Sequence, residues 1–198
     1  MILGYHVIFT AYGFWLSNDP RGSWSTFVAS WELLLAGGKA TKTSERRSSA
    51  HDEHDQQKRM QAKKTLNFSP VEFSGAQALT VAHGFAEAIN SAAYVVYACS
   101  ILPSHVHMVV ARGNRKAETI VGHLKSKATH HLRNAKRHPF EQFVRADGSV
   151  PGVWAEGSWK VFLNTPQSVR RAIDYVEANP LKERKPKQIW SFVMPYGM

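Results

Sequence analysis

Two β-rich segments joined by only two residues constrain the fold of this chain most strongly. The first runs from Tyr94 to Leu102 and the second from His105 to Ala111, with Pro103-Ser104 between them. Both segments are rich in β-branched and other apolar residues, and a connection this short is typical of a β-hairpin. The sequence therefore predicts an antiparallel pair of strands near the middle of the chain.

The segments around this hairpin alternate between strand and helix patterns. A strand is predicted over 5–13, ending at a glycine, and a short strand over 159–163. Between the strands lie two amphipathic helices. The first begins after a capping box formed by Ser74 and Gln77, and the second has its apolar residues between 120 and 135, before Pro139.

A third helix is predicted after the last strand. Thr165 is its cap, Pro166 occupies the favoured first position, and Asn179-Pro180 closes it. Without this helix the order is β-α-β-β-α-β, so the expected fold class is α+β, with a ferredoxin-like antiparallel sheet. The first and third strands should be central, both earlier helices should cover one face, and the terminal helix could reach the other.

A polar stretch interrupts this pattern after the first strand. Residues 39–64 contain eight basic and four acidic residues and almost nothing apolar, which indicates an exposed insertion, helical between Asp55 and Lys64. We take residues 1–198 as a single domain that carries this insertion. The aromatic residues before it are expected to cover part of the main core: Trp15, Trp24, Phe27 and Trp31.

Composition narrows the class of partner. The net charge is +10 and 43% of the residues are hydrophobic, which favours a folded chain with a polyanionic partner, most often nucleic acid. The single cysteine excludes a disulfide framework, and we find neither a signal peptide nor a membrane span, so a cytoplasmic protein is expected. Basic clusters at 112–137 and 182–187, the latter followed by Trp190 and Phe192, should flank the site and bind phosphates; ordinary solvated faces are the alternative.

Two patterns carry candidate chemistry. His105 and His107 alternate on one strand, so both imidazoles project from one face and could share a cation, although an isolated pair of this kind more often consists of ordinary hydrogen-bonded histidines. Tyr175 and Asn179 are neighbours at i and i+4 on the terminal helix. Tyr175 lies at the edge of the apolar stripe, where an amphipathic packing role is the simpler alternative.

Taken together, these motifs resemble the HUH single-tyrosine transposases, most closely the REP-associated tyrosine transposases. The run 99–110, with His105 and His107 flanking one hydrophobic residue, is similar to the family's histidine hairpin. The run 172–180 is similar to its Tyr-hydrophobic-x-x-Asn-Pro helix. Residues 5–9 and 159–163 also resemble family segments.

This resemblance implies an activity and a role for each residue. His105, His107 and Asn179 match the ligands of a divalent metal, Mg²⁺ or Mn²⁺, and Tyr175 matches the nucleophile. The implied enzyme is a single-stranded DNA endonuclease and strand transferase that forms a 5′-phosphotyrosine in DNA transposition, on DNA that forms hairpins. The family occurs as monomer or homodimer; the short link from Leu163 to Thr165 favours a Tyr175 that serves its own chain.

Two other classes remain open from the sequence. The first is a nucleic-acid-binding protein that does not cut, because RNA-recognition domains share the topology. Those domains carry stacking aromatic residues on their central strands, where this chain has His105 and His107, and this difference favours the enzyme. The second is a zinc protein that uses these two histidines and a third, such as His6 or His123.

Overall fold

The computed structural model describes residues 1–23, 25–43 and 52–197. Contacts divide the chain into two compact units. Unit 1 consists of residues 1–11 and 72–198, and unit 2 of residues 12–71. Each unit is described separately below.

Unit 1 is built on one four-stranded sheet. Its strands are β1 (Gly4–Thr10), β2 (Val96–Ile101), β3 (His105–Ala111) and β4 (Trp159–Leu163), in the order β2-β3-β1-β4. Every neighbouring pair is antiparallel. The α+β class, the hairpin and the central position of the first and third strands are therefore confirmed.

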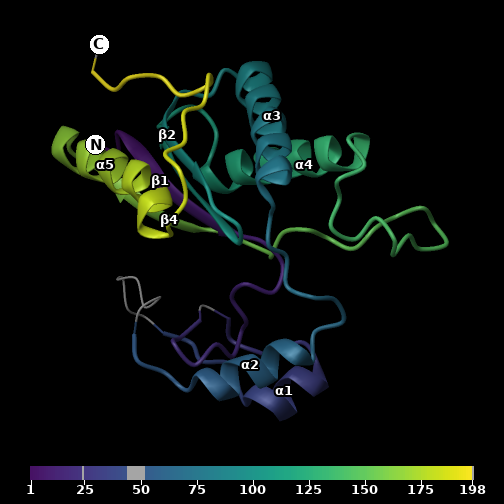
Figure 1. The fold of residues 1–198 in the computed structure, drawn as a ribbon. Coiled ribbons are helices and arrows are strands. Elements are labelled where there is room, and N and C mark those ends of the chain that lie inside the picture. The colour runs from purple at the N-terminus through teal and green to yellow at the C-terminus, as the bar shows by residue number, and fades with distance from the viewer. Residues whose placement is uncertain (24, 44–51, 198) are drawn as a thin grey trace. The chain divides into compact units, whose positions relative to one another are not determined.

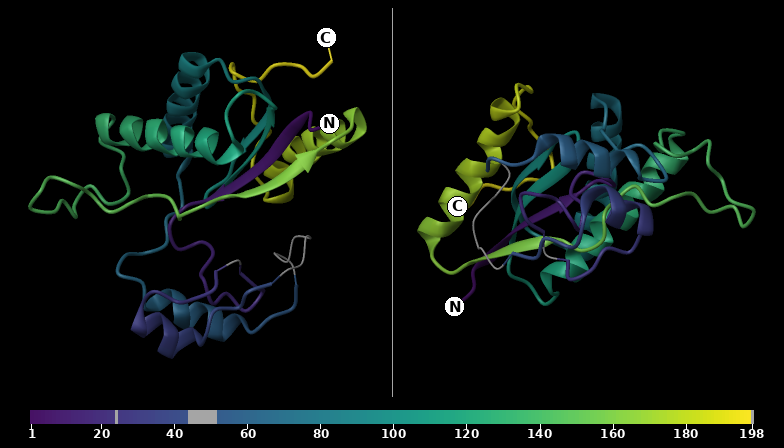
Figure 2. Two further views of the ribbon diagram at one scale, coloured as in Figure 1. Left: turned by 180° about the vertical axis from the view of Figure 1, so that it is seen from behind. Right: turned by 90° about the horizontal axis from the view of Figure 1, so that it is seen from below.

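Three helices complete unit 1. Helices α3 (Gly75–Ala92) and α4 (Ala117–Asn134) pack on each other over one face of the sheet, while α5 (Pro166–Lys182) packs on β2, β3 and β4 over the other (Figures 1 and 2). At the crossing of α3 and α4, a Cβ on Gly84 would lie 2.6 Å from Cα of Ala128. The two helices approach this closely only because residue 84 has no side chain.

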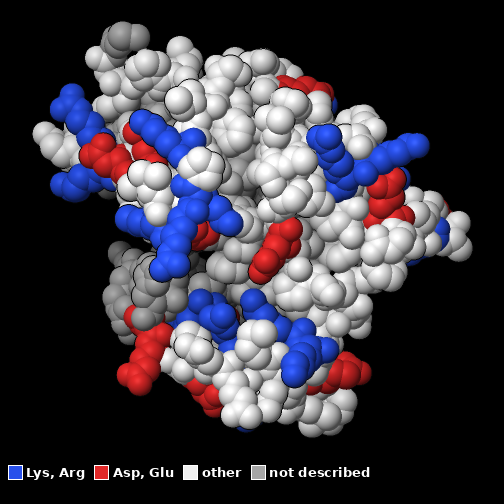
Figure 3. Space-filling view, viewed as in Figure 1, with Lys and Arg blue, Asp and Glu red and all other residues white. Residues whose placement is uncertain are grey.

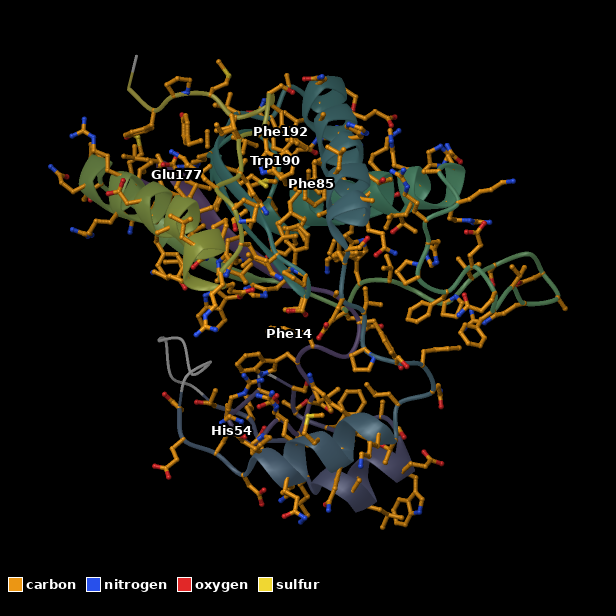
Figure 4. The ribbon with its side chains drawn as sticks, in the orientation of Figure 1. Phe14, His54, Phe85, Glu177, Trp190 and Phe192 are labelled. Atoms are coloured by element: carbon orange, nitrogen blue, oxygen red, sulfur yellow. The ribbon has the colours of Figure 1, made fainter. Side chains whose placement is uncertain are left out.

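Each face of the sheet has its own apolar core. Val106 and Met108 of β3 are fully buried on the α3 and α4 side, where Phe9 meets the edge of Phe85 at 5.9 Å between ring centroids. Figure 4 labels Phe85 between α3 and the sheet. On the other face a smaller cluster holds α5: Ala98, Val109, Leu163, Val169, Ala172 and Val176. This second core fixes which stripe of α5 faces the sheet.

Helix α5 begins as predicted but ends later than predicted. Thr165 and Ser168 form a capping box, with Pro166 at the first position. We expected Asn179-Pro180 to close the helix, and this expectation was wrong, because Pro180 lies inside α5. Proline removes only its own N–H from the last turn, and the N–H of Glu183 completes that turn by donating to the carbonyls of Asn179 and Pro180.

The chain after α5 returns along the outer edge of β2. The side-chain amide of Gln188 accepts a hydrogen bond from the N–H of Ile101 and donates one to its carbonyl, both at 2.8 Å. Further on, the N–H of Met194 donates to the carbonyl of Val96 at 2.8 Å. Both ends of this edge strand therefore have partners.

Unit 2 contains two short helices, α1 (Trp31–Gly37) and α2 (Gln56–Lys64). The helix expected between Asp55 and Lys64 is confirmed, and Asp55 caps it by accepting from the N–H of Lys58. A small apolar cluster of Leu16, Leu33 and Ala62 gives this unit a core of its own. The polar stretch 39–64 is thus only part of a longer inserted segment.

Trp15, Phe27 and Trp31 belong to unit 2, so the expectation that these three cover the main core was wrong. Trp15 donates from Nε1 to the carbonyl of Gly22 at 2.7 Å. The guanidinium of Arg21 lies over the Trp15 ring, 3.9 Å from the ring centroid. Phe27 and Trp31 are exposed. Trp24 lies outside the described residues. Aromatic residues are usually buried in a core. Here Trp15 instead makes a local cation–π contact, and Phe27 and Trp31 face solvent.

Across the described residues, no helix combines the length and the apolar character that crossing a membrane requires.

Candidate active site

The two histidines of β3 project from the face of the sheet that α5 covers. His107 is paired with Ile8 of β1 and Ser100 of β2, and it is 6% exposed. His105, at the start of the strand, has its ring centroid 5.0 Å from that of His107. Val106 and Met108 point to the opposite layer, so the alternation predicted from the sequence is confirmed.

A third histidine, His6 of β1, lies beside this pair. Its Nε2 atom is 3.0 Å from Nδ1 of His107, within hydrogen-bond distance. His6 is opposite Val109 in the ladder, so it shares the face of His105 and His107. From the sequence, His6 was a candidate only as a zinc ligand. Its place follows from the central position of β1 and the register with β3, which one sequence does not reveal.

Tyr175 of α5 stands over the histidines. Its ring centroid lies 5.7 Å from that of His6 and 5.6 Å from that of His107. The residue is 41% exposed, so a ligand can approach it from solvent. Lys182, two helical turns later, holds its ammonium 4.6 Å from the centre of the tyrosine ring. All of these side chains belong to one chain: Tyr175, the histidines and Lys182.

Asn179 follows Tyr175 by one turn and is buried, as expected for a residue on the inner face of α5. Its Nδ2 atom has no hydrogen-bond partner among the described residues. The same holds for Oγ of Ser100, which lies next to His107 on the sheet. Buried polar groups are normally paired. These two unpaired groups, one on α5 a turn after Tyr175 and one on β2 beside His107, could take polar atoms of a ligand.

Glu183, the residue that follows α5, approaches the other histidine. Its Oε1 atom is 3.6 Å from Nε2 of His105. On its other side, Nδ1 of His105 contacts Oγ of Ser104 at 3.2 Å. The helix was expected to end at Asn179-Pro180, so Glu183 was not a candidate site residue.

Burial lowers the pKa of all three histidines. The pKa of His6 and that of His105 fall to about 4, and the cause is desolvation. The pKa of His107 falls to about 2, first by desolvation and then by the charges of His105, His6 and Lys182. The imidazoles are therefore neutral at pH 7. Neutral imidazole is the form that binds a metal ion.

Imidazole nitrogens are atoms that bind divalent cations. At this site, however, the side chains approach one another two at a time. Within the described part of the chain, no three His, Cys, Asp or Glu side chains are gathered closely enough to hold a metal ion. Both β3 histidines direct Nδ1 toward a neighbour, and Nε2 of His105 faces Oε1 of Glu183. Asn179, a substrate phosphate and water would supply further ligands, since magnesium retains several positions for such oxygens.

The basic residues are distributed differently from what we expected. The cluster 112–137 lies largely on α4, which covers the face of the sheet opposite to the histidines, so it does not flank this site. Figure 3 shows Lys and Arg side chains, with some acidic ones, over α5 and the segment after it. Trp190 and Phe192 stack on each other, with centroids 6.2 Å apart, and Figure 4 labels both.

The two histidines considered for a zinc site lie in different places. His123 belongs to α4, on the opposite layer, where Nδ1 contacts the hydroxyl of Tyr94 at 3.2 Å. His6 is at the site, but its nearest nitrogen faces a nitrogen of His107 at hydrogen-bond distance rather than a common centre. This arrangement gives the zinc alternative no support.

Comparison with known proteins identifies two similar folds. No protein-family model matches the chain, and no curated protein is significantly similar to it. One solved structure, a REP-associated tyrosine transposase bound to a REP hairpin, is 14% identical, with 96% of this chain and 74% of that one covered at a TM-score of 0.48. Another, a protein of Deinococcus radiodurans R1 assigned as a transposase, is 11% identical, with 89% and 90% covered at a TM-score of 0.42. At these identities and TM-scores, function has to be inferred from the side chains of this chain.

Proposed function

We propose that this protein is a metal-dependent single-stranded DNA endonuclease and strand transferase, a transposase that acts through a 5′-phosphotyrosine. The observation that supports this best is the approach of the Tyr175 ring to the rings of His6 and His107, within 6 Å of each. Tyr175 is 41% exposed beside a lysine, so a DNA strand can reach its ring from solvent. An accessible phenol next to neutral imidazoles suits nucleophilic attack on a phosphodiester.

The reaction begins when the Tyr175 oxygen bonds to phosphorus of the scissile phosphate. The bond from phosphorus to the 3′ oxygen of the preceding nucleotide breaks, the phenol loses its proton to solvent, and the departing oxygen gains one. The products are a 5′-phosphotyrosine and a 3′-hydroxyl. Because the covalent link retains the phosphodiester energy, a 3′-hydroxyl can attack in reverse and join strands without ATP.

Each side chain of the site has its own role in this reaction. His105, His107 and Asn179 would bind a divalent cation, Mg²⁺ or Mn²⁺, which as a Lewis acid stabilises charge on the scissile phosphate. Lys182 stabilises negative charge on the phenol oxygen, because its ammonium lies 4.6 Å from the ring centroid. The unpaired Nδ2 of Asn179 can donate to a phosphate oxygen if the amide turns that way.

A covalent-adduct assay tests this proposal. The protein is incubated with Mn²⁺ and labelled hairpin-forming single strands whose flanking sequences are randomised, then run on a denaturing gel. We expect a protein-linked band that disappears with EDTA and in Tyr175→Phe. Tyr94→Phe is the matched control, because its hydroxyl contacts His123 on the other layer. If DNA is retained on a native gel but no band survives denaturation, the chain is a binding protein and the proposal is wrong.

A further inference from the structure

A pocket lies on the flank of α5 that faces the segment after the helix. Its volume is about 460 Å³, and it is lined by α5, by Tyr97 of β2 and by residues 193–196. All of these parts belong to unit 1. None of the lining residues contributes to the candidate active site, so the reaction at Tyr175 does not account for the chemistry of this pocket.

Two tyrosine rings and an aliphatic side chain form one wall of the pocket. The rings of Tyr97 and Tyr196 meet edge to face, with their centroids 4.9 Å apart. Both rings and Ile173 are partly buried and pack against the apolar cluster that holds α5 on the sheet, which fixes their positions. Proteins that bind single-stranded DNA stack its bases on aromatic side chains. This wall therefore suits a planar ring.

Charged side chains of α5 line the exposed part of the pocket: Arg170, Asp174 and Glu177, the last of which Figure 4 labels. Arg170 and Asp174 are at i and i+4, a spacing at which opposite charges often pair. In the part of the chain that the structure describes, however, neither carboxylate forms an ion pair with the Arg170 guanidinium. The pocket thus offers hydrogen-bond donors and acceptors to a ligand.

A guanine base matches this combination of groups. Bases of single-stranded DNA present a planar face for stacking and an unpaired edge for hydrogen bonds. Guanine carries N1–H and the 2-amino group side by side, which suit the two oxygens of one carboxylate. Its O6 and N7 atoms accept hydrogen bonds from arginine. Adenine, cytosine and thymine each lack two neighbouring donor groups on the pairing edge, so they match the pocket less well.

The pocket and the Tyr175 ring lie on different flanks of one helix. Successive residues are rotated by about 100°, so Asp174 and Glu177 stand about 100° and 160° from Tyr175 in the same sense. The outer half of a helix about 10–12 Å wide measures roughly 16–19 Å around. A strand whose phosphate is at Tyr175 therefore reaches the pocket after a few nucleotides. Arg171 is exposed between the two and can contact the phosphates on this path.

We propose that this pocket binds a guanine base of the single-stranded DNA, a few nucleotides from the scissile phosphate, and so selects where the strand is cut. The inference rests on the proposed function, because it concerns the substrate of that enzyme. Asp174 or Glu177 accepts hydrogen bonds from N1–H and the 2-amino group, and Arg170 donates to O6. The base stacks on a tyrosine ring of the pocket wall.

Sequencing of cleaved strands tests the proposal. In the adduct assay with randomised flanks, both fragments are sequenced, the one linked to protein and the released one. For the wild type we expect guanine to be enriched at one flank position by at least about fivefold. In the double variant Asp174→Asn with Glu177→Gln, the enrichment should fall below about twofold. The control, Glu72→Gln with Glu141→Gln, removes two exposed acids elsewhere in unit 1 and should keep the wild-type preference.

Inosine in place of guanine separates recognition of the base from a general effect of charge. Inosine lacks only the 2-amino group, so one of the two neighbouring donors is lost. At the selected position, it should slow adduct formation by the wild type roughly 5- to 100-fold. The double variant should react with the guanine and inosine strands at rates within about twofold of each other. Its rate on the inosine strand should equal that of the wild type, which shows that the variant is folded.

The outcomes distinguish this inference from the proposed function. If the wild type forms adducts without preferring guanine, or if the double variant keeps the preference, the pocket does not read the base, while the proposed function stands. If no strand forms an adduct, that function is wrong, and fluorescence anisotropy then compares the binding of hairpin strands with guanine or inosine in their flanks. Equal affinities overturn the inference as well, whereas tighter binding of guanine that is lost in the double variant supports it.

Discussion

Nε2 of His6 and Nδ1 of His107 lie 3.0 Å apart between the two central strands. Both imidazoles are neutral at pH 7, so one ring donates the shared proton and the other accepts it. A metal ion on Nε2 of His107 requires the ring proton on Nδ1, so a metal-binding His107 donates its proton to Nε2 of His6. We therefore propose that His6 is a positioning residue, which orients His107 without itself binding the ion.

Replacing His6 should therefore weaken metal binding indirectly. We expect His6→Ala to lower Mn²⁺ affinity by roughly 10- to 100-fold and to reduce the free energy of unfolding by about 1–3 kcal/mol, because Nδ1 of His107 loses its partner. Calorimetric titration and urea unfolding measure the two effects. His123→Ala, on α4, is the matched control and should leave Mn²⁺ affinity unchanged. Equal losses in both variants would contradict the positioning role.

Lys182 should affect the rate of cleavage more than the binding of DNA. Lys182→Gln removes the charge 4.6 Å from the Tyr175 ring, so the phenol oxygen loses stabilisation as it becomes negative. We expect single-turnover adduct formation to slow by roughly 10- to 1000-fold, with less than about a fivefold change in DNA affinity. Lys187→Gln, an exposed lysine beyond the helix, is the control. A pure affinity loss would assign Lys182 to phosphate binding alone.

Asn179 and Tyr175 should differ in their response to metal. Asn179→Ala removes one proposed neutral ligand, which water can replace, so excess Mn²⁺ should restore part of the cleavage activity. Tyr175→Phe removes the proposed nucleophilic oxygen, and no concentration of Mn²⁺ should restore the activity. Adduct yield across a Mn²⁺ series measures both. A rescued Tyr175→Phe would mean that another residue attacks the DNA.

The metal-free protein should lose stability in mild acid. The pKa of His6 and that of His105 are about 4 in the folded chain, against 6.5 for an unperturbed histidine. Between these values the unfolded chain binds more protons, so the free energy of unfolding falls as the pH drops from 7 toward 4, by up to roughly 3 kcal/mol for each histidine. Urea unfolding in EDTA at pH 7.5 and 5.0 tests this, and His6→Gln should show a smaller difference. Equal stability at the two pH values would refute it.

A complete site within one chain predicts the outcome of a mixing experiment. Tyr175, His6 and His107 approach one another within a single chain. A mixture of Tyr175→Phe and His107→Ala proteins should therefore form no DNA adduct, because neither has both parts of a site. Adduct formation in the mixture, with each variant inactive alone, would show that subunits exchange the tyrosine helix.

The sequence predicted those parts of the fold and site that depend on local patterns. β3 and β4 have the predicted bounds, and the capping residues Ser74 and Thr165 begin their helices, because alternation and capping involve residues close in sequence. Tyr175 and Asn179 share a helix face for the same reason. These signals required no knowledge of how the strands pair.

The remaining site residues depend on tertiary structure. His6 joins the site through the register between β1 and β3, whose partners are about one hundred residues apart in sequence. Glu183 was missed because a proline preceded by asparagine indicates a helix end, whereas the helix continues by one short turn. Trp15 was misassigned because its contacts with Gly22 and Arg21 are local to unit 2, and hydrophobicity alone does not distinguish two small cores from one.

The pairing of Gln188 with Ile101, and of Met194 with Val96, has a consequence for self-association. The outer side of β2 would otherwise offer a template to which a second copy could add a strand, repeating from molecule to molecule. Here an amide side chain imitates a strand partner at one end of β2, and the returning backbone occupies the other. A second copy could add a strand here only after the segment that follows α5 had been displaced from β2. The segment after α5, the tyrosine helix, thus blocks strand addition at the β2 edge.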